Sequence, residues 1–382
     1  MTVPQNLEEL CEALHRPAKH QRTISITGAG TKHGMAGALA NADESISTIG
    51  LNQIIEYEPR DLTISVEAGV LWRDLTAVLA KNKQMIPLDP PFAQNATVGG
   101  VIASNSSGPR RRLYGTARDV VIGMQFATLQ GKAVQSGGMV VKNVAGLDMG
   151  KLMIGSFGTL AAIAVVNFKV QPAPEVERSF LLAFPSLTAA MEGRDRILTG
   201  PLQPAAIDLL NPAAAATLGN ASWLLAIRAG GNAAAVDRYE REFTGVGDGM
   251  AFDDDRQTIL WRRIQEFTPA FLETHRAGAV VRISCTLKET QAVMGAFEGP
   301  AVARAGNGVC YGYFEQAYAA DAWFRDAAPR GWKGVIEFSP AEGKASWNLW
   351  PSPGADFEIM RKVKGMFDPS NLLNRGRLYH RI

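Results

Sequence analysis

The chain has 382 residues, of which 46% are hydrophobic and 20% are charged, and its formal net charge at pH 7 is +2. This length exceeds one typical domain of about 100–200 residues, and it predicts two domains or one domain with a large insertion. The small net charge excludes a bulk attraction to nucleic acid or to anionic lipid, so we expect neither as a direct partner.

The cysteines and the N-terminal stretch indicate in which cellular compartment the protein lies. Cys11, Cys285 and Cys310 are widely spaced without a CxxC pair, which indicates neither a disulfide framework nor a zinc or iron–sulfur site. The first residues predict a short amphipathic helix that differs from a secretion signal. No run of 18 apolar residues predicts a membrane span. We therefore expect a cytoplasmic protein that reaches the inner face of a membrane only through partners.

Strand and helix signals alternate along the chain. Residues 20–70 contain short alternating bursts that end at Gly, Asn or Pro, which predicts strands. Residues 71–82 have the apolar spacing of an amphipathic helix, and the alternation around residues 130–132 predicts a hairpin. Two prolines within 169–179 indicate a domain crossing. Residues 180–335 again mix both signals, so the predicted fold class is α+β.

Three glycine clusters follow or precede strand-like segments. They are "ITGAGTKHGMAG" (26–37), "NATVGGVIASNSSG" (95–108) and "IGSFG" (154–158). Bare backbone amides donate hydrogen bonds to anionic oxygens where a side chain would collide, which is the chemistry of a pyrophosphate cradle. The first cluster is not a Rossmann GxGxxG motif, because residues 32–34 break the spacing. Each cluster alone also fits a plain turn, but together they suit a long cofactor with a diphosphate middle.

The chain also contains three further motifs, "GPRRRLYG", "VKNVAGLDMGKLMIGS" and "FDPSNLLNRGRLY". In these motifs and in the three glycine clusters, the chain resembles the FAD-binding family of vanillyl-alcohol oxidase and p-cresol methylhydroxylase. The likeness is most specific to FAD-binding subunits of bacterial glycolate oxidases. It covers nearly all of residues 20–175 and returns at 366–379. The resemblance implies an FAD domain of two α+β subdomains at 1–172, an α+β cap domain at 173–354, and a C-terminal segment, 355–382, that packs back on the FAD domain.

The resemblance also implies which residues bind the cofactor. Some relatives hold the flavin covalently through a histidine directly after the glycine pair. The only candidate, His33, lies three residues beyond Gly30 and better fits a histidine that caps its own loop, so we expect non-covalent FAD. The positions assigned to FAD are Gly28, Ala29, Gly30, Thr31, Lys32, His33, Pro90, Thr97, Gly99, Gly100, Ser104, Asn105, Ser107, Gly108, Tyr114, Gly155, Gly158, Ile163 and Asn374.

Arginines are the candidates for holding a substrate carboxylate during oxidation of a 2-hydroxy acid. Arg228 and Arg282 lie in strand-like runs of the cap and are predicted in this catalytic role, although each also fits a strand residue in a salt bridge. The run 110–112 fits a solvated surface, an anionic substrate or the FAD phosphates. Four aromatic residues fit either the core or the wall of the flavin cavity: Tyr311, Tyr313, Trp347 and Trp350.

The resemblance implies a function shared with partners. Catalytic relatives carry a histidine pair and a glutamate that hold a divalent metal, whereas the predicted cap has one histidine, His275, so we expect no metal site. The implied role is the FAD-binding subunit of a glycolate oxidase complex, which oxidises glycolate and similar small 2-hydroxy acids to 2-oxo acids. Its implied partners are an FAD-containing catalytic D subunit and an iron–sulfur F subunit. Two alternatives stay open: a self-sufficient FAD-dependent D-2-hydroxy-acid dehydrogenase, and a structural flavin-binding subunit without a redox role.

Overall fold

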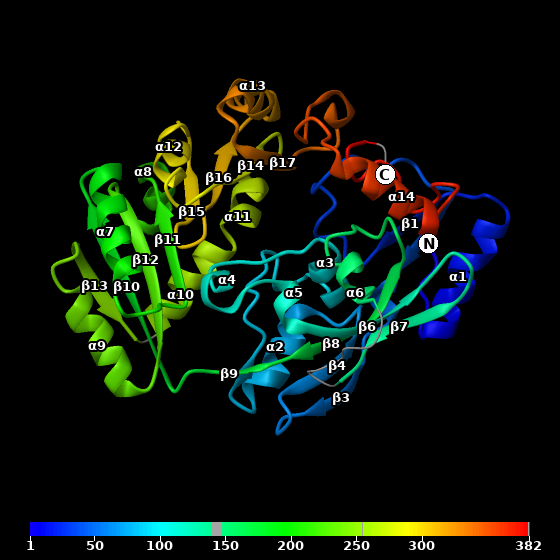
Figure 1. The fold of residues 1–382 in the computed structure, drawn as a ribbon, viewed down its shortest axis with the longest axis horizontal. Coiled ribbons are helices and arrows are strands. Elements are labelled where there is room, and N and C mark those ends of the chain that lie inside the picture. Colours follow the sequence, from blue (N-terminus) through cyan, green and yellow to red (C-terminus); the bar gives the residue numbers. More distant parts are fainter. Residues whose placement is uncertain (140–146, 254, 381) are drawn as a thin grey trace. The chain divides into compact units, whose positions relative to one another are not determined.

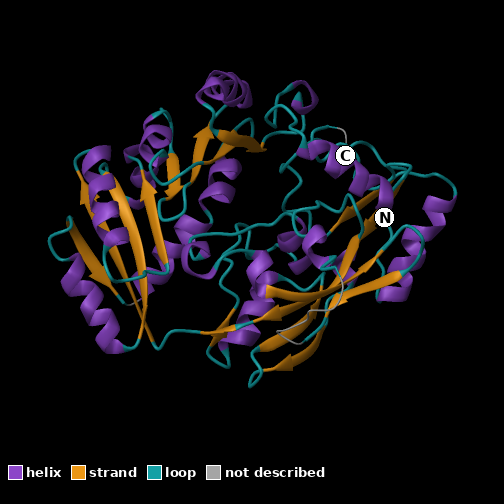
Figure 2. Ribbon diagram, in the orientation of Figure 1, coloured by secondary structure: helices purple, strands orange, loops and turns teal. Residues whose placement is uncertain are grey.

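The computed structural model describes residues 1–139, 147–253, 255–380 and 382. It is a mixed α+β protein, which confirms the predicted fold class (Figures 1 and 2). The chain divides into two compact units. The first comprises Met1–Ser107, Gly115–Ala173 and Ser352–Ile382, and the second comprises Gly108–Tyr114 and Pro174–Pro351. The short segment Gly108–Tyr114 was expected in the FAD domain, but it packs with the second unit.

The first unit contains a five-stranded antiparallel sheet in the order β3-β4-β8-β6-β7 and a separate parallel pair, β1–β2. Its strands are β1 Ile24–Thr27, β2 Glu44–Ser47, β3 Ile54–Glu58, β4 Thr63–Glu67, β5 Gln84–Met85, β6 Val121–Ala127, β7 Ala133–Gly137, β8 Ala162–Lys169 and β9 Gln171–Pro172. Its helices are α1 Leu7–Lys19, α2 Trp72–Ala80, α3 Val98–Ala103, α5 Ala117–Val120, α6 Gly150–Met153 and α14 Asp356–Phe367, with a 3-10 turn at Thr48–Gly50. The predicted hairpin is confirmed as β6–β7.

Strand β8 is the centre of this unit because both of its faces are buried. Val166 and Phe168 pack in a cluster with residues of α2 and α3. Ala164 and Val165 pack in another cluster with residues of α1 and β1. A strand buried on both faces reads as a continuous apolar run, which is the pattern "AIAVVNF" at its start. The first six residues of the motif "VKNVAGLDMGKLMIGS", 141–146, lie outside the described residues.

The second unit is built on one eight-stranded sheet in the order β13-β10-β12-β11-β15-β16-β14-β17. Its strands are β10 Val176–Phe184, β11 Ala206–Leu210, β12 Trp223–Gly231, β13 Asp248–Phe252, β14 Ala279–Ser284, β15 Ala301–Arg304, β16 Val309–Phe314 and β17 Lys333–Phe338. Its helices are α4 Arg111–Tyr114, α7 Leu187–Thr199, α8 Pro212–Ala215, α9 Ala233–Phe243, α10 Asp255–Gln265, α11 Phe267–Thr274, α12 Thr290–Gly295 and α13 Ala317–Ala327. Short 3-10 turns lie at Ala216–Leu218, Ala328–Arg330 and Lys344–Ser346.

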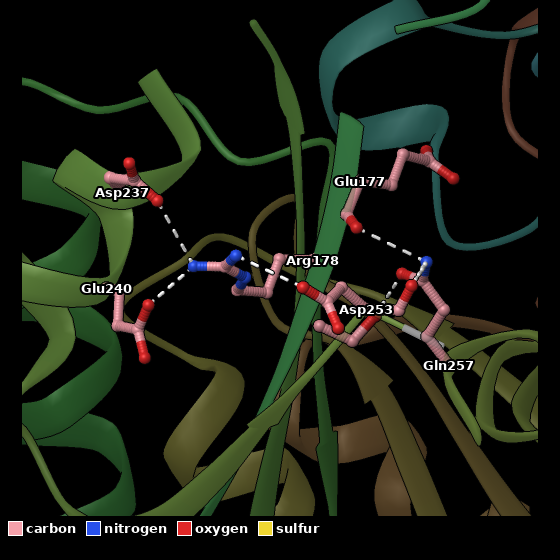
Figure 3. A network of polar contacts seen from close by, with 7 residues as sticks. Glu177, Arg178, Asp237, Glu240, Asp253 and Gln257 are labelled. Carbon is pink, nitrogen blue, oxygen red and sulfur yellow. Dashed lines mark hydrogen bonds and ion pairs between the residues drawn. The ribbon is translucent and has the colours of Figure 1, made fainter. Parts of the chain in front are cut away.

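One face of this sheet is covered by helices. This face packs against α7, α9, α12 and α13 and forms the main apolar core. At the β10 end of the sheet, Arg178 forms ion pairs with Asp237 and Glu240 of α9 and with Asp253 after β13 (Figure 3). Three carboxylates around one guanidinium fix the edge of the sheet to its helix. No helix among the described residues is long and apolar enough to cross a membrane.

Candidate functional site

Residues of all three glycine clusters line one pocket of the first unit. The loop after β1 forms one wall, α3 and its cap form another, and the segment that leads into β8 forms a third. Thr48 and, from the C-terminal segment, Asn374 and Arg377 complete the lining. The residues assigned to FAD that line this pocket are Gly28, Ala29, Gly30, Thr31, Lys32, His33, Thr97, Gly99, Gly100, Ser104, Gly158, Ile163 and Asn374.

Two glycines keep the first loop close to its neighbours and open toward the pocket. A Cβ at Gly28 would lie 2.2 Å from Oγ1 of Thr97, so the loop packs here only with glycine. Gly30 has a φ of +74°, which favours glycine, and a Cβ there would meet nothing within 4 Å. Thr97 also caps α3, because its Oγ1 accepts a hydrogen bond of 3.2 Å from Gly100 N. The loop is thus held from behind while space remains in front of it.

The C-terminal segment is tied to the same pocket by two polar side chains. Asn374 Nδ2 donates a hydrogen bond of 2.7 Å to the carbonyl oxygen of Phe157, and its Oδ1 accepts one of 2.7 Å from Ile26 N. The Arg377 guanidinium donates at 3.2–3.3 Å to the carbonyl oxygens of Lys32, His33 and Gly37. This segment therefore cross-links the first and third glycine clusters.

The pocket is electropositive. Its described lining contains no Asp or Glu, while Lys32 and Arg377 are each only 8% exposed. Burial lowers the pKa of Arg377 to about 10. The Arg377 guanidinium donates its hydrogen bonds to neutral carbonyl oxygens, so a bound anion would stabilise its buried charge. The glycine-lined wall and this charge fit the diphosphate of FAD.

Not every assigned residue lines the pocket. Gly155 lies behind it, where its N–H donates to the carbonyl oxygen of Ile102 at 3.1 Å. Gly108 and Tyr114 lie in the second unit. The assigned residues outside the lining are Pro90, Asn105, Ser107, Gly108, Tyr114 and Gly155. Arg377 was missed, because only the three-dimensional path of the C-terminal segment brings it to the first loop.

A polar band crosses the face of the second unit's sheet opposite the main core. It consists of one residue from each of five adjacent strands, in the spatial order Asp208, Arg304, Tyr311, Arg282 and Glu337. Their sequence neighbours point into the core, and strand side chains alternate between faces. Arg304 is ion-paired with Asp208, and Arg282 Nε lies 2.7 Å from the Glu337 carboxylate.

The centre of this band is suited to an anion. Arg304 is 9% exposed, and its Nε has no hydrogen-bond partner among the residues that the structure describes. Its guanidinium lies 5.6 Å from the centre of the Tyr311 ring. Arg111, from the segment Gly108–Tyr114, lies close enough to interact electrostatically with this group, and burial lowers its pKa. Burial also raises the pKa of Tyr311, so its hydroxyl stays a hydrogen-bond donor at neutral pH.

Arg228, the other arginine predicted in a catalytic role, lies outside this band and fits the alternative of a strand residue in a salt bridge. Its guanidinium makes two hydrogen bonds to Glu177, at 3.0 and 2.6 Å, and lies over the Trp261 ring. Strands β12 and β14 are four strand spacings apart, or about 19 Å. The two arginines therefore cannot hold one small carboxylate together.

The arginine run 110–112 is not a solvated surface, since all three side chains are partly buried. Arg112 donates at 2.8 Å to the carbonyl oxygen of Pro204 and to Oε1 of Gln203, which anchors the segment to the second unit. Tyr313 is a core residue that hydrogen-bonds Thr268 at 2.9 Å. Among the described residues there is no group of three or more His, Cys, Asp or Glu side chains that would hold a metal ion.

Comparisons with known proteins agree with the pocket. Residues 1–137 match the family model described as FAD binding domain, and residues 343–378 match that of FAD linked oxidases, C-terminal domain. Glycolate oxidase subunit GlcE of Escherichia coli (strain K12) is 30% identical over 85% of this chain and 84% of its own length. Glycolate oxidase subunit GlcD of Bacillus subtilis (strain 168) is 25% identical over 99% of this chain and 88% of its own length.

Solved structures share the fold at low identity. A p-cresol methylhydroxylase structure aligns with a TM-score of 0.76 and 14% identity, over 98% of this chain and 87% of the other. An alkyldihydroxyacetonephosphate synthase aligns with a TM-score of 0.75 and 18% identity, over 97% and 75%. The pocket, the matched domains and the GlcE similarity together show that the chain belongs to the FAD-linked oxidoreductases, with the fold of p-cresol methylhydroxylase and with FAD as its cofactor.

Proposed function

We propose that this chain is the FAD-binding subunit of a glycolate oxidase complex. Its general activity is FAD-dependent oxidation of a 2-hydroxy acid at the CH–OH group, for which the flavin supplies the hydride acceptor. The specific substrates in this proposal are glycolate and similar small 2-hydroxy acids. The proposed partners are an FAD-containing D subunit and an iron–sulfur F subunit, which receive the electrons.

The polar band carries the substrate part of the proposal. The Tyr311 hydroxyl can donate a hydrogen bond to a carboxylate, and the neighbouring Arg282 side chain is 30% exposed and therefore accessible. Guanidinium groups bind carboxylates through strong charge-assisted hydrogen bonds. This arrangement supports binding of a small carboxylic acid in the second unit.

The same band supports dependence on a partner. Oxidation of an alcohol needs a base for the hydroxyl proton. Both carboxylates of the band, Asp208 and Glu337, are already ion-paired with arginines. The second unit has one histidine, His275, and its ring stacks on Phe271 with centroids 4.4 Å apart. We therefore expect this subunit to bind the acid and to rely on the D subunit for the proton transfer.

The test replaces the accessible arginine and its partner together, as Arg282→Gln with Glu337→Gln, so that no buried charge is left unpaired. We expect the KM of the reconstituted complex for glycolate to rise at least about tenfold, because the double variant loses roughly one charge-assisted hydrogen bond to the substrate carboxylate. The FAD content of the chain should stay unchanged. Arg276→Gln, an exposed arginine of the same unit, is the control. An unchanged KM in the double variant would exclude the band as the substrate site.

A self-sufficient D-2-hydroxy-acid dehydrogenase is the second candidate. It is favoured by the D-lactate dehydrogenase of Archaeoglobus fulgidus, which is 24% identical over 99% of this chain and 91% of its own length. In that case the isolated FAD-loaded chain would be reduced by its substrate without a partner.

A further inference from the structure

Two cysteines that are distant in sequence lie together on the core face of the second unit's sheet. In the antiparallel pairing of β14 with β16, Cys310 is opposite Ile283. Cys285 N donates at 2.8 Å to the carbonyl oxygen of Gly308, so Cys285 lies two positions further along the same face. The two thiols lie close enough for each to influence the pKa of the other. They are therefore diagonal cross-strand neighbours.

The surroundings of Cys285 favour its thiolate. The hydrogen bond from Cys310 is the main cause that lowers the pKa of Cys285, against burial, which raises it. The Thr290 hydroxyl, 3.9 Å from Cys285 Sγ, lowers this pKa further, and the buried Arg194 acts in the same direction. The Glu289 carboxylate opposes them. Cys285 is partly exposed at the end of β14, whereas Cys310 is fully buried.

We propose that Cys285 and Cys310 form a redox-active dithiol that hydroperoxides oxidise reversibly to a disulfide. Cys285 is the attacking thiol, because it is the exposed member of the pair, and Cys310 is the resolving thiol behind it. Reactive cysteines are partly exposed, lie near cationic groups, and often have a second thiol beside them. This assignment does not rest on the proposed function, and its test needs neither substrate nor partner.

The reaction balances with hydrogen peroxide as the oxidant. The Cys285 thiolate attacks one peroxide oxygen, the O–O bond breaks, and hydroxide leaves and takes a proton to become water. The resulting sulfenic acid is attacked by the Cys310 sulfur, so an S–S bond forms and the S–O bond breaks with release of a second water. Two thiols thus lose two electrons and two protons, and the peroxide is reduced to two waters.

The site allows the sulfurs to approach. Diagonal neighbours on antiparallel strands have Cα atoms about 7–8 Å apart, slightly beyond the usual disulfide span of about 4.4–6.8 Å. Cys285 follows the last paired residue of β14, Ser284, and its N–H and its thiol both donate hydrogen bonds to the carbonyl oxygen of Gly308, at 2.8 and 3.4 Å. A small shift of this strand end brings the two sulfurs to bonding distance.

The experiment treats the FAD-loaded full chain with hydrogen peroxide, blocks free thiols with N-ethylmaleimide under denaturing conditions, and digests with trypsin. Cleavage after Arg282, Lys288, Arg304 and Arg325 separates the peptides 283–288 and 305–325, which carry one cysteine each. We expect these peptides to be joined by a disulfide that dithiothreitol reverses. Cys11, buried in α1, is the internal control and should remain a free thiol.

Two variants and a pH profile complete the test. In Cys310→Ala, peroxide should leave a sulfenic acid on Cys285 that dimedone traps, and in Cys285→Ser, Cys310 should not react. Alkylation of Cys285 in the native protein should rise with pH through a midpoint below 9 and run at least about tenfold faster at pH 7.5 than that of Cys11, whose pKa burial raises. If Cys285 and Cys310 both remain free thiols after peroxide, or if Cys285 is oxidised without bonding to Cys310, the proposal is overturned.

Discussion

Arg377 is the residue whose role is least visible in the sequence and most specific in the structure. It is buried, its guanidinium binds three carbonyl oxygens of the first glycine loop, and it lines the FAD pocket. A cation in this place both holds the loop in shape and offsets the charge of a diphosphate. Loss of the cation should therefore weaken cofactor binding more than it weakens the fold.

The prediction concerns Arg377→Gln, which keeps hydrogen-bond donors but removes the charge. We expect the Kd for FAD to rise about 10- to 100-fold, because a hydrogen bond to a charged group contributes roughly 1.5–3 kcal/mol. The measurement is titration of the apoprotein with FAD, followed by flavin fluorescence. Arg375→Gln is the matched control, since Arg375, two residues away, is partly exposed, lies outside the pocket lining and donates to the carbonyl oxygen of Asn41 at 3.4 Å. Equal affinities of the two variants would remove Arg377 from the cofactor site.

At the scale of elements, the end of α14 fixes the C-terminal segment in place. Lys364 is buried, and its Nζ donates at 2.6 Å to Asp368 and at 2.7 Å to the carbonyl oxygen of Thr159. The Asp368 carboxylate also accepts hydrogen bonds of 2.9 and 2.8 Å from the N–H groups of Leu372 and Leu373. One carboxylate thus neutralises a buried ammonium and shapes the turn after the helix.

Asp368→Ala should therefore destabilise the first unit severely. It leaves the Lys364 ammonium buried without its carboxylate, and breaking a buried pair in this way costs about 3–5 kcal/mol. Denaturant unfolding monitored by FAD release measures the loss. Glu358→Ala on the same helix removes an exposed i,i+3 ion pair with Arg361, and it should cost less than about 1 kcal/mol. A similar cost for both variants would contradict the assigned role of Asp368.

Elements with a strong local signal were predictable from the sequence. The amphipathic spacing of residues 71–82 becomes α2, Trp72–Ala80, and the alternation around residues 130–132 becomes the β6–β7 hairpin. Helix α3 was not predicted, because glycines disfavour helices. It forms because Thr97 caps it and because Val101 and Ile102 are fully buried. Burial in tertiary structure here outweighs the intrinsic preference of the chain.

The candidate sites were predictable only in part, for a similar reason. The glycine loops are contiguous motifs, so their role in binding FAD was inferable from sequence. The polar band is assembled by strand register from residues as far apart as Asp208 and Glu337, and no local pattern indicates that arrangement. The salt bridge of Arg228 is assembled in the same way, since strand pairing also brings its partner Glu177 to it.

At the scale of the whole molecule, the pocket that fits FAD lies in the first unit, and the polar band proposed for the substrate carboxylate lies in the second. The chain crosses between the two compact units several times, and the segment Gly108–Tyr114 follows the second glycine cluster directly. Arg112 anchors this segment to the second unit. If this chain carries electrons within a complex, its flavin must become reduced when substrate and partners are present.

The most direct test is an anaerobic titration of the FAD-loaded chain with glycolate, followed through its oxidised-flavin absorbance, first alone and then with the D and F subunits. Loading this chain with an FAD analogue of shifted absorbance separates its signal from that of the D subunit. We predict that the band persists when the chain is alone and bleaches when the partners are added. Bleaching of the isolated chain, or a band that stays oxidised while the complex turns over glycolate, would contradict the proposed function.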